Sequence, residues 1–175
     1  MQPSMHGRVG ASTLMTASLR TSIRPVYPRS ATRSGQPILV AEVMSAPVRT
    51  VAQSASASDA QALMQGARDC QHLVVVDDDG RVVGVVSDRD LRAAAPSMLL
   101  VRDAGHRMRA LALVRVANVM TANPQSVHAS QPLRVALLLM RRHKIGCIPV
   151  VDDDSRPVGL VTGPDVIKLT LRLLP

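Results

Sequence analysis

The sequence predicts an α+β fold in which two β-α-β-β-α repeats pack as a pseudo-two-fold pair. One stretch of the chain occurs twice, at residues 73–91 and at residues 148–166. Each copy has a run of β-branched residues, three aspartates, a second such run and a Gly-x-x-Ser/Thr-x-x-Asp ending that suits a helix start. Hydrophobic residues make up 46% of the chain and aromatic residues 1%, so an aliphatic core is expected.

The first repeat is expected at residues 39–96. A short helical turn ends before Pro47, and residues 50–51 form a strand. Ser54 or Ser56 caps the N-terminus of the next helix. Two strands follow, joined by an Asp-Asp-Asp-Gly hairpin turn, and a second helix opens at Ser87. Both strands are nearly continuous apolar runs, so we expect both of their faces to be covered.

The second repeat is expected at residues 116–173, with the same order of elements. Pro132 starts its first long helix and Pro164 lies in the first turn of its last helix, positions where proline is tolerated. Residues 97–115 form a linker with helical pieces, whose leucines are expected to pack on the body. The alternative is a basic amphipathic helix for a partner or a membrane surface. Two repeats packed sheet to sheet would leave two related crevices between them.

Residues 1–38 are expected to be a disordered basic arm, because they lack apolar periodicity. They contain five arginines and no acidic residue, so they contribute +5 of the chain's net charge of +8. A flexible arm, a misassigned start and an organellar transit peptide all fit this composition.

Composition and motifs exclude several functions for the body. Its charge is nearly balanced and its aromatic residues are scarce, so nucleic acid is an unlikely partner. The two cysteines form no framework, which indicates reduced thiols and a cytoplasmic location. No apolar run is long enough to cross a membrane. Nucleophile–base pairs and metal-ligand patterns are absent, so we expect neither an enzyme nor an obligatory cofactor, and we read the aspartate triads as turns.

The two Gly-x-x-Ser/Thr-x-x-Asp endings are the candidate sites. Ser87 with Asp90, and Thr162 with Asp165, have the spacing of a capping box, which alone accounts for both pairs. The same geometry also suits a nucleotide, since an aspartate beside a helix N-terminus can accept hydrogen bonds from ribose hydroxyls while the helix end attracts phosphate. The preceding glycine would let a ligand or a backbone approach closely.

Together these motifs resemble a tandem pair of CBS (cystathionine-β-synthase) domains, a Bateman module, over about residues 39–173. The run from Ser87 to Ser97 is also similar to stand-alone CBS proteins of the acetoin-utilisation type. The resemblance implies energy sensing through an adenosine nucleotide (AMP, ADP, ATP or S-adenosylmethionine) bound in clefts between the repeats. The ligand-binding residues that it implies are Asp90 and Asp165 for ribose, Ser87, Thr162 and Arg89 near phosphate, and Thr50, Val51, Ser126 and Val127 around the bases.

The sequence therefore predicts a non-catalytic regulatory module that signals to a regulated protein and forms a homodimer. The alternative is a structural CBS scaffold that only dimerises and has degenerate sites. The second copy has Gly163 and Pro164 where the first has Asp88 and Arg89, so the two sites are not expected to be equivalent.

Overall fold

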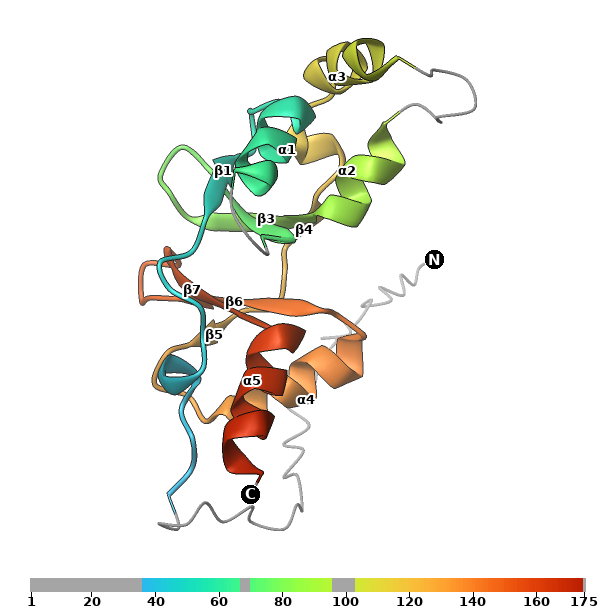
Figure 1. The fold of residues 1–175 in the computed structure, drawn as a ribbon. Helices are drawn as coiled ribbons and strands as arrows, with labels where there is room; N and C mark the ends of the chain where they lie inside the picture. The colour runs from blue at the N-terminus through green and yellow to red at the C-terminus, as the bar shows by residue number, and fades with distance from the viewer. Residues whose placement is uncertain (1–35, 67–69, 96–102, 175) are drawn as a thin grey trace, which may run out of the picture. The chain divides into compact units, whose positions relative to one another are not determined.

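The computed structural model of the chain describes residues 36–66, 70–95 and 103–174. It confirms the mixed fold of two β-α-β-β-α repeats (Figure 1). The first repeat contains η1 (Val40–Glu42), β1 (Thr50–Ala52), α1 (Ala57–Gln65), β2 (His72–Val76), β3 (Val82–Ser87) and α2 (Asp88–Ala94), and α3 (Ala104–Ala112) lies in the linker. The second contains η2 (Val116–Asn118), β4 (Thr121–Ala122), β5 (Val127–His128), α4 (Leu133–His143), β6 (Cys147–Val151), β7 (Pro157–Thr162) and α5 (Gly163–Leu173). The predicted arm lies outside the described residues, except for its last three.

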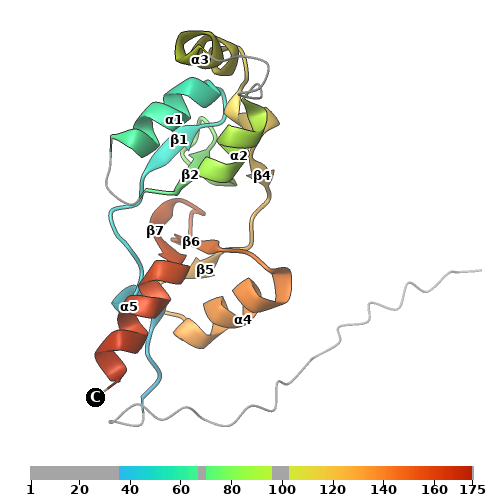
Figure 2. The same cartoon turned by 45° about the vertical axis from the view of Figure 1, so that its right-hand side comes forward.

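The strands form two sheets, in the orders β1-β2-β3-β4 and β5-β6-β7. In each sheet the first strand runs parallel to the second, and the second and third form an antiparallel hairpin. Helices α1 and α2 lie beside the first sheet, while α4 and α5 lie beside the second (Figures 1 and 2). Val74 and Val85 from the first sheet pack with Cys147 and Leu160 from the second, so the sheets meet through an apolar layer.

The hairpin turns are built by aspartate side chains in both copies. The Oδ1 atom of Asp77 accepts hydrogen bonds from the backbone N–H groups of Asp79 and Arg81, at 3.1 and 2.7 Å. Asp152 does the same for Asp154 and Arg156, at 3.0 and 2.8 Å. Among the described residues no cluster of His, Cys, Asp or Glu could hold a metal ion. Asp77 and Asp152 act as turn-forming residues, because their side chains accept hydrogen bonds from backbone N–H groups of the two hairpin turns.

Each repeat begins with a segment that packs into the other repeat. Val40 of η1 is fully buried in the core of the second repeat, beside Val127 and Leu133. Val116 of η2 is fully buried in the core of the first, which also contains Leu111 of α3. Leu111 of the linker thus packs on the body as predicted, whereas Leu113 is 88% exposed. The sequence boundaries of the repeats are consequently not the boundaries of their cores.

The backbone pairing shows the same exchange of segments, in which the first segment of each repeat packs on the other repeat. Strand β4, at the start of the second repeat, pairs with β3 of the first, with Thr121 opposite Val85. Ser45, at the equivalent place in the first repeat, pairs with Leu160 of β7 through two backbone hydrogen bonds of 2.9 and 3.1 Å. The two crossings are related by the same pseudo-symmetry as the repeats.

The glycines of the repeated motif leave room for the exchanged segments. A Cβ atom at Gly159 would lie 2.5 Å from Sδ of Met44, and one at Gly84 would overlap Sδ of Met120 even more. Gly84 and Gly159 are both buried. The sequence left open whether a ligand or a backbone approaches each glycine; in the structure the space above each glycine holds the side chain of a methionine from the exchanged segment.

Candidate functional site

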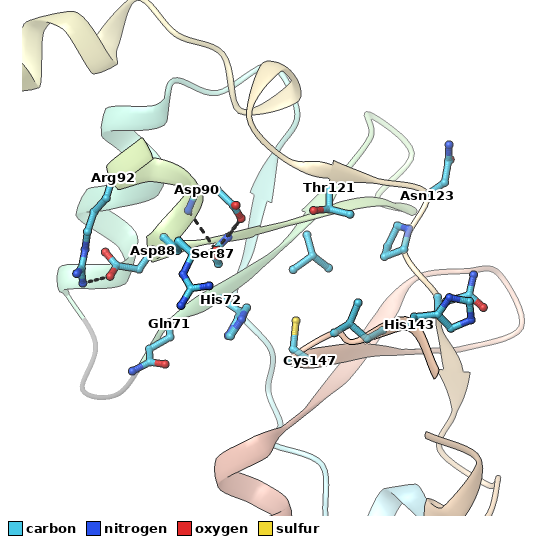
Figure 3. A pocket seen from close by; sticks show the side chains of 16 residues that line it. Gln71, His72, Ser87, Asp88, Asp90, Arg92, Thr121, Asn123, His143 and Cys147 are labelled. Carbon is cyan, nitrogen blue, oxygen red and sulfur yellow. Dashed lines mark hydrogen bonds and ion pairs between the residues drawn. The ribbon is translucent and has the colours of Figure 1, made fainter. Parts of the chain in front are cut away.

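A cavity of about 900 Å³ lies where the two repeats meet. It is bounded on one side by strands β2, β3 and β4 and the first turn of α2, and on the other by the end of α4 and the start of β6, and the loop after β4 completes the wall (Figure 3). Its wall consists of Gln71, His72, Val85, Ser87, Asp88, Arg89, Asp90, Arg92, Thr121, Asn123, Pro124, Gln125, His143, Ile145, Gly146 and Cys147.

Asp90 has one carboxylate oxygen available to the cavity. Its Oδ2 accepts hydrogen bonds from the backbone N–H and the hydroxyl of Ser87, at 2.8 and 2.6 Å. The Ser87 hydroxyl oxygen in turn accepts from the Asp90 N–H at 3.2 Å, which completes the predicted capping box. Within the described parts of the chain, Oδ1 accepts no hydrogen bond. This oxygen can therefore accept from a ligand hydroxyl without disturbing the cap.

Positive charge accompanies this aspartate. Arg89 is exposed at the cavity wall, whereas Arg92 forms an ion pair with Asp88 one turn away. The Asp88–Arg92 pair neutralises itself, so Arg89 is the cation on α2 that is available to an anionic ligand group.

Asp90 also acts on two titratable groups in the cavity wall. Burial lowers the pKa of His72, and the negative charge of Asp90 opposes part of that change. Burial raises the pKa of the Cys147 thiol to about 11, and Asp90 adds to it. Near neutral pH both side chains are therefore uncharged. The thiol belongs to the other repeat, so the field of Asp90 reaches across the cavity.

The second candidate aspartate has a different environment. Asp165 lines a smaller cavity of about 230 Å³, together with the polar residues Glu42, Ser45, Lys168 and Arg172 and the apolar residues Val43, Met44 and Leu169. Its Oδ2 accepts from the N–H and hydroxyl of Thr162, at 2.8 and 2.5 Å. Its Oδ1 accepts from the Ser45 hydroxyl at 2.8 Å.

The other predicted site residues lie away from these two cavities. Val51 and Val127 are buried in the two hydrophobic cores, and Thr162 is a partly buried cap residue. Thr50 and Ser126 are exposed beside those valines. None of the five is part of either cavity wall. The assignment of Thr162 to phosphate and of the other four residues to the bases stays a prediction from family resemblance.

Sequence reasoning predicted only three of the 16 residues in the wall of the larger cavity, namely Ser87, Arg89 and Asp90. The missed polar residues include His72, Thr121, Asn123 and His143. Helix α4 ends at His143 and is followed by Lys144 in a left-handed conformation at φ 55°. The constant spacing between repeats gives the symmetry of these positions, but only the exchange of segments brings residues 121–125 beside α2.

Comparisons with known proteins agree with this architecture. The family model for the CBS domain matches residues 40–97 and 116–172. A CBS domain-containing protein of Dictyostelium discoideum is 36% identical over 108 residues, which cover 62% of this chain and 74% of that protein. Homoserine O-acetyltransferase of Methanococcoides burtonii is 30% identical over 130 residues, which cover 74% of this chain but only 24% of the enzyme.

Three solved structures are similar over most of the described chain. The CBS domain pair of protein MJ0100, in complex with 5′-methylthioadenosine and S-adenosyl-L-methionine, has 26% identity and a TM-score of 0.64, covering 78% of this chain and 98% of that one. AcuB from Vibrio cholerae, which carries an acetoin-utilization name, has 31% identity and a TM-score of 0.63, covering 79% and 93%. CBSX2 in complex with AMP has 28% identity and a TM-score of 0.62, covering 78% and 99%.

The structure also bears on the membrane question. No helix among the described residues is long and apolar enough to cross a bilayer.

The resemblance inferred from the motifs, including that to acetoin-utilisation-type proteins, is confirmed by the two family matches and the similar structures. The chain belongs to the CBS-domain family, as a tandem pair of CBS domains.

Proposed function

We propose that this CBS pair is a non-catalytic regulatory module that binds an adenosine nucleotide at Asp90 and passes its bound state to a partner protein. The observation that carries the proposal is the free Oδ1 of Asp90 beside Arg89 on a cavity of about 900 Å³. A cavity of this size is in the range that holds small ligands. The related structures with AMP and with S-adenosylmethionine support adenosine as the ligand's common part.

The charges favour a phosphate-bearing ligand over S-adenosylmethionine. Asp90 is suited to accept from the ribose hydroxyls, and the Arg89 guanidinium is suited to pair with phosphate oxygens. S-adenosylmethionine carries a positive sulfonium that would gain nothing from Arg89. We therefore expect AMP, ADP or ATP to bind more tightly, while adenosine alone binds weakly.

Calorimetric titration with AMP, ADP, ATP and S-adenosylmethionine tests the function. Asp90→Asn should weaken nucleotide binding about ten- to a hundredfold, because the amide oxygen is retained by the Ser87 cap and the NH2 group that replaces the free oxygen cannot accept from a ribose hydroxyl. Asp59→Asn is the matched control, since Asp59 forms the same capping box with Ser56 on α1, outside the cavity. Equal binding by both variants and the wild type would leave Asp90 with a capping role alone.

The role of Arg89 has its own control. Arg89→Gln should weaken ATP and AMP binding about tenfold while changing adenosine binding little. Arg81→Gln removes an exposed arginine of the β2–β3 turn that is not part of the cavity wall, and should leave all affinities unchanged. Equal losses in the two variants would indicate a general charge effect rather than a phosphate contact.

The alternative function is a scaffold whose CBS pair only dimerises. One observation favours a dimer interface, both for such a scaffold and for a regulatory module. Helix α5 and its C-terminal end expose Ile167, Leu171 and Leu174, each more than half accessible and spaced to share one face of a helix. We propose that this face forms a homodimer, whether or not nucleotide binds.

Light scattering at micromolar concentration tests the dimer. The wild type should have twice the chain mass, and Leu171→Glu should reduce it to the monomer mass, because a charge in an apolar interface is costly. Val158→Glu is the control, since Val158 lies on β7 and is also exposed. A monomeric wild type, with and without nucleotide, would contradict the interface.

A further inference from the structure

The two capping aspartates differ in what their second carboxylate oxygen does. Oδ1 of Asp90 accepts no hydrogen bond within the described residues, and Asp90 is partly accessible at the large cavity. Oδ1 of Asp165 accepts from the Ser45 hydroxyl at 2.8 Å. Asp165 is 6% exposed and is the only charged side chain among the described residues that is buried. Every oxygen of Asp165 therefore already has a protein donor.

This difference arises in the side chains rather than in the backbone. Ser45 faces Leu160 in the second repeat as Thr121 faces Val85 in the first, so the exchanged segments are placed equivalently. The Ser45 hydroxyl reaches across to the aspartate of α5. The Thr121 hydroxyl lines the large cavity and makes no hydrogen bond to Asp90 in the described structure. One repeat thus has a closed aspartate and the other an open one.

A ribose would gain little at the closed aspartate. Its hydroxyl would have to displace Ser45 from a buried carboxylate, so one hydrogen bond would be exchanged for another. The cavity beside Asp165, about 230 Å³, is smaller than the usual range for small-molecule sites. Its wall holds the carboxylates of Asp165 and Glu42 and the cations of Lys168 and Arg172, so its charges balance and give a phosphate no net attraction.

We propose that the chain binds one nucleotide, at Asp90, and that Asp165 acts as a structural tie. The tie fastens the exchanged segment at Ser45 to the first turn of α5. This inference rests on the function proposed above for its binding half, but the tie itself does not require a ligand. Ser45 is then the residue that distinguishes the two repeats, because it supplies the donor that closes the second aspartate.

The binding half is tested by stoichiometry in calorimetric titrations of the full chain with AMP and ATP. The wild type should bind one nucleotide per chain, and Asp90→Asn should lower the affinity at least tenfold with no second binding event. Asp165→Asn should keep one site, with an affinity within about twofold of the wild type. Two nucleotides per wild-type chain, or binding that survives in Asp90→Asn and fails in Asp165→Asn, would overturn the one-site proposal. If the wild type binds none of these nucleotides, the proposed function fails instead.

The structural half is tested by thermal unfolding without ligand, which remains informative in every case. Ser45→Ala should lower the melting temperature by about 3–8 °C, because a buried carboxylate loses a hydrogen-bond donor. Thr121→Ala, the pseudo-symmetric change, should lower it by less than about 2 °C. Equal melting temperatures for Ser45→Ala and the wild type would show that the hydrogen bond to Asp165 does not stabilise the fold.

Discussion

At the residue scale, Gly84 and Gly159 set how closely the repeats approach each other. Each lies beneath a methionine that the opposite repeat sends across with its first segment, Met120 over Gly84 and Met44 over Gly159. A side chain at either glycine would push the methionine, and with it the exchanged segment, away from the sheet. The motif glycine is therefore a packing requirement between repeats, and the proposed nucleotide site begins three residues later at Ser87.

Gly84→Ala should lower the free energy of unfolding by about 1–3 kcal/mol, because the added methyl group overpacks the contact with Met120. Gly163→Ala is the control, since a Cβ there meets nothing within 4 Å. It lies in the first turn of α5, where alanine is at least as stable as glycine. Urea denaturation measures both changes. A neutral Gly84→Ala would show that Met120 moves aside at no cost.

Cys147 gives the chain a pH dependence on the alkaline side. Burial raises the pKa of its thiol from 9.0 to about 11 in the folded state. Between these values the unfolded chain releases a proton that the folded chain keeps, so stability falls as pH rises through 9. At pH 10 the loss should be about 1–1.5 kcal/mol relative to pH 7.

Urea denaturation at pH 7, 9 and 10 checks this loss. Cys147→Ala should remove that part of the pH dependence, whereas Cys70→Ala leaves Cys147 in place and should retain it. Asp90→Asn should reduce the loss, because the aspartate's charge contributes to raising the pKa of the thiol. A pH profile that is the same with and without Cys147 would contradict the assignment.

At this scale the sequence predicts local chemistry well. The capping pairs Ser87–Asp90 and Thr162–Asp165 could be recognised because both partners are three residues apart. The hydrogen bond from Ser45 to Asp165 joins residues 120 positions apart, so no sequence spacing predicts it. The inequivalence of the two sites was predicted from Gly163 and Pro164, yet the feature that closes the second aspartate lies elsewhere.

At the element scale, the exchanged segments 38–46 and 114–122 are what hold the two repeats together. Periodicity identified the strands and helices, because each has one apolar pattern of its own. It could not identify which core a three-residue η1 or η2 would enter, since Val40 and Val116 look alike in either place. The order of elements was therefore predictable, and their partners across the repeats were not.

Val40→Ala and Val116→Ala should each cost about 1–3 kcal/mol, because both side chains are fully buried in a core. Val158→Ala is the control, since Val158 is 37% exposed. Both core variants should still unfold in one transition, because each valine belongs to the opposite repeat. Calorimetry checks this, and two separate transitions would contradict the mutual dependence of the repeats.

At the scale of the whole molecule, the body begins a few residues before the first repeat. Ile38 packs on the core of the second repeat, and its carbonyl accepts a hydrogen bond from the Leu133 N–H at 2.8 Å. The composition of the preceding residues predicts an arm without a core, and residues 1–35 lie outside the described structure. The body thus begins within the predicted arm of residues 1–38, because Ile38 is already anchored to the core of the second repeat.

Deletion of residues 1–35 should leave the melting temperature within about 2 °C of that of the full chain, because a polar segment without apolar periodicity contributes no core. Deletion of residues 1–38 also removes Ile38 and should lower it by several degrees. Thermal unfolding of the two truncations separates them. A large loss in the shorter deletion would mean that the arm packs on the body.

The crossing of segments has a consequence for synthesis on the ribosome. When the chain has emerged up to residue 112, strands β1, β2 and β3 are present, but Val116, which fills the first core, and β4, which completes the first sheet, are not. At roughly 5–20 residues per second, the first core waits about 0.5–2 s for residues 113–122. Val40 emerges early and waits roughly 6–24 s for its core partners Val150 and Val161. The first segment of the body thus remains without its core until most of the second repeat has been synthesised.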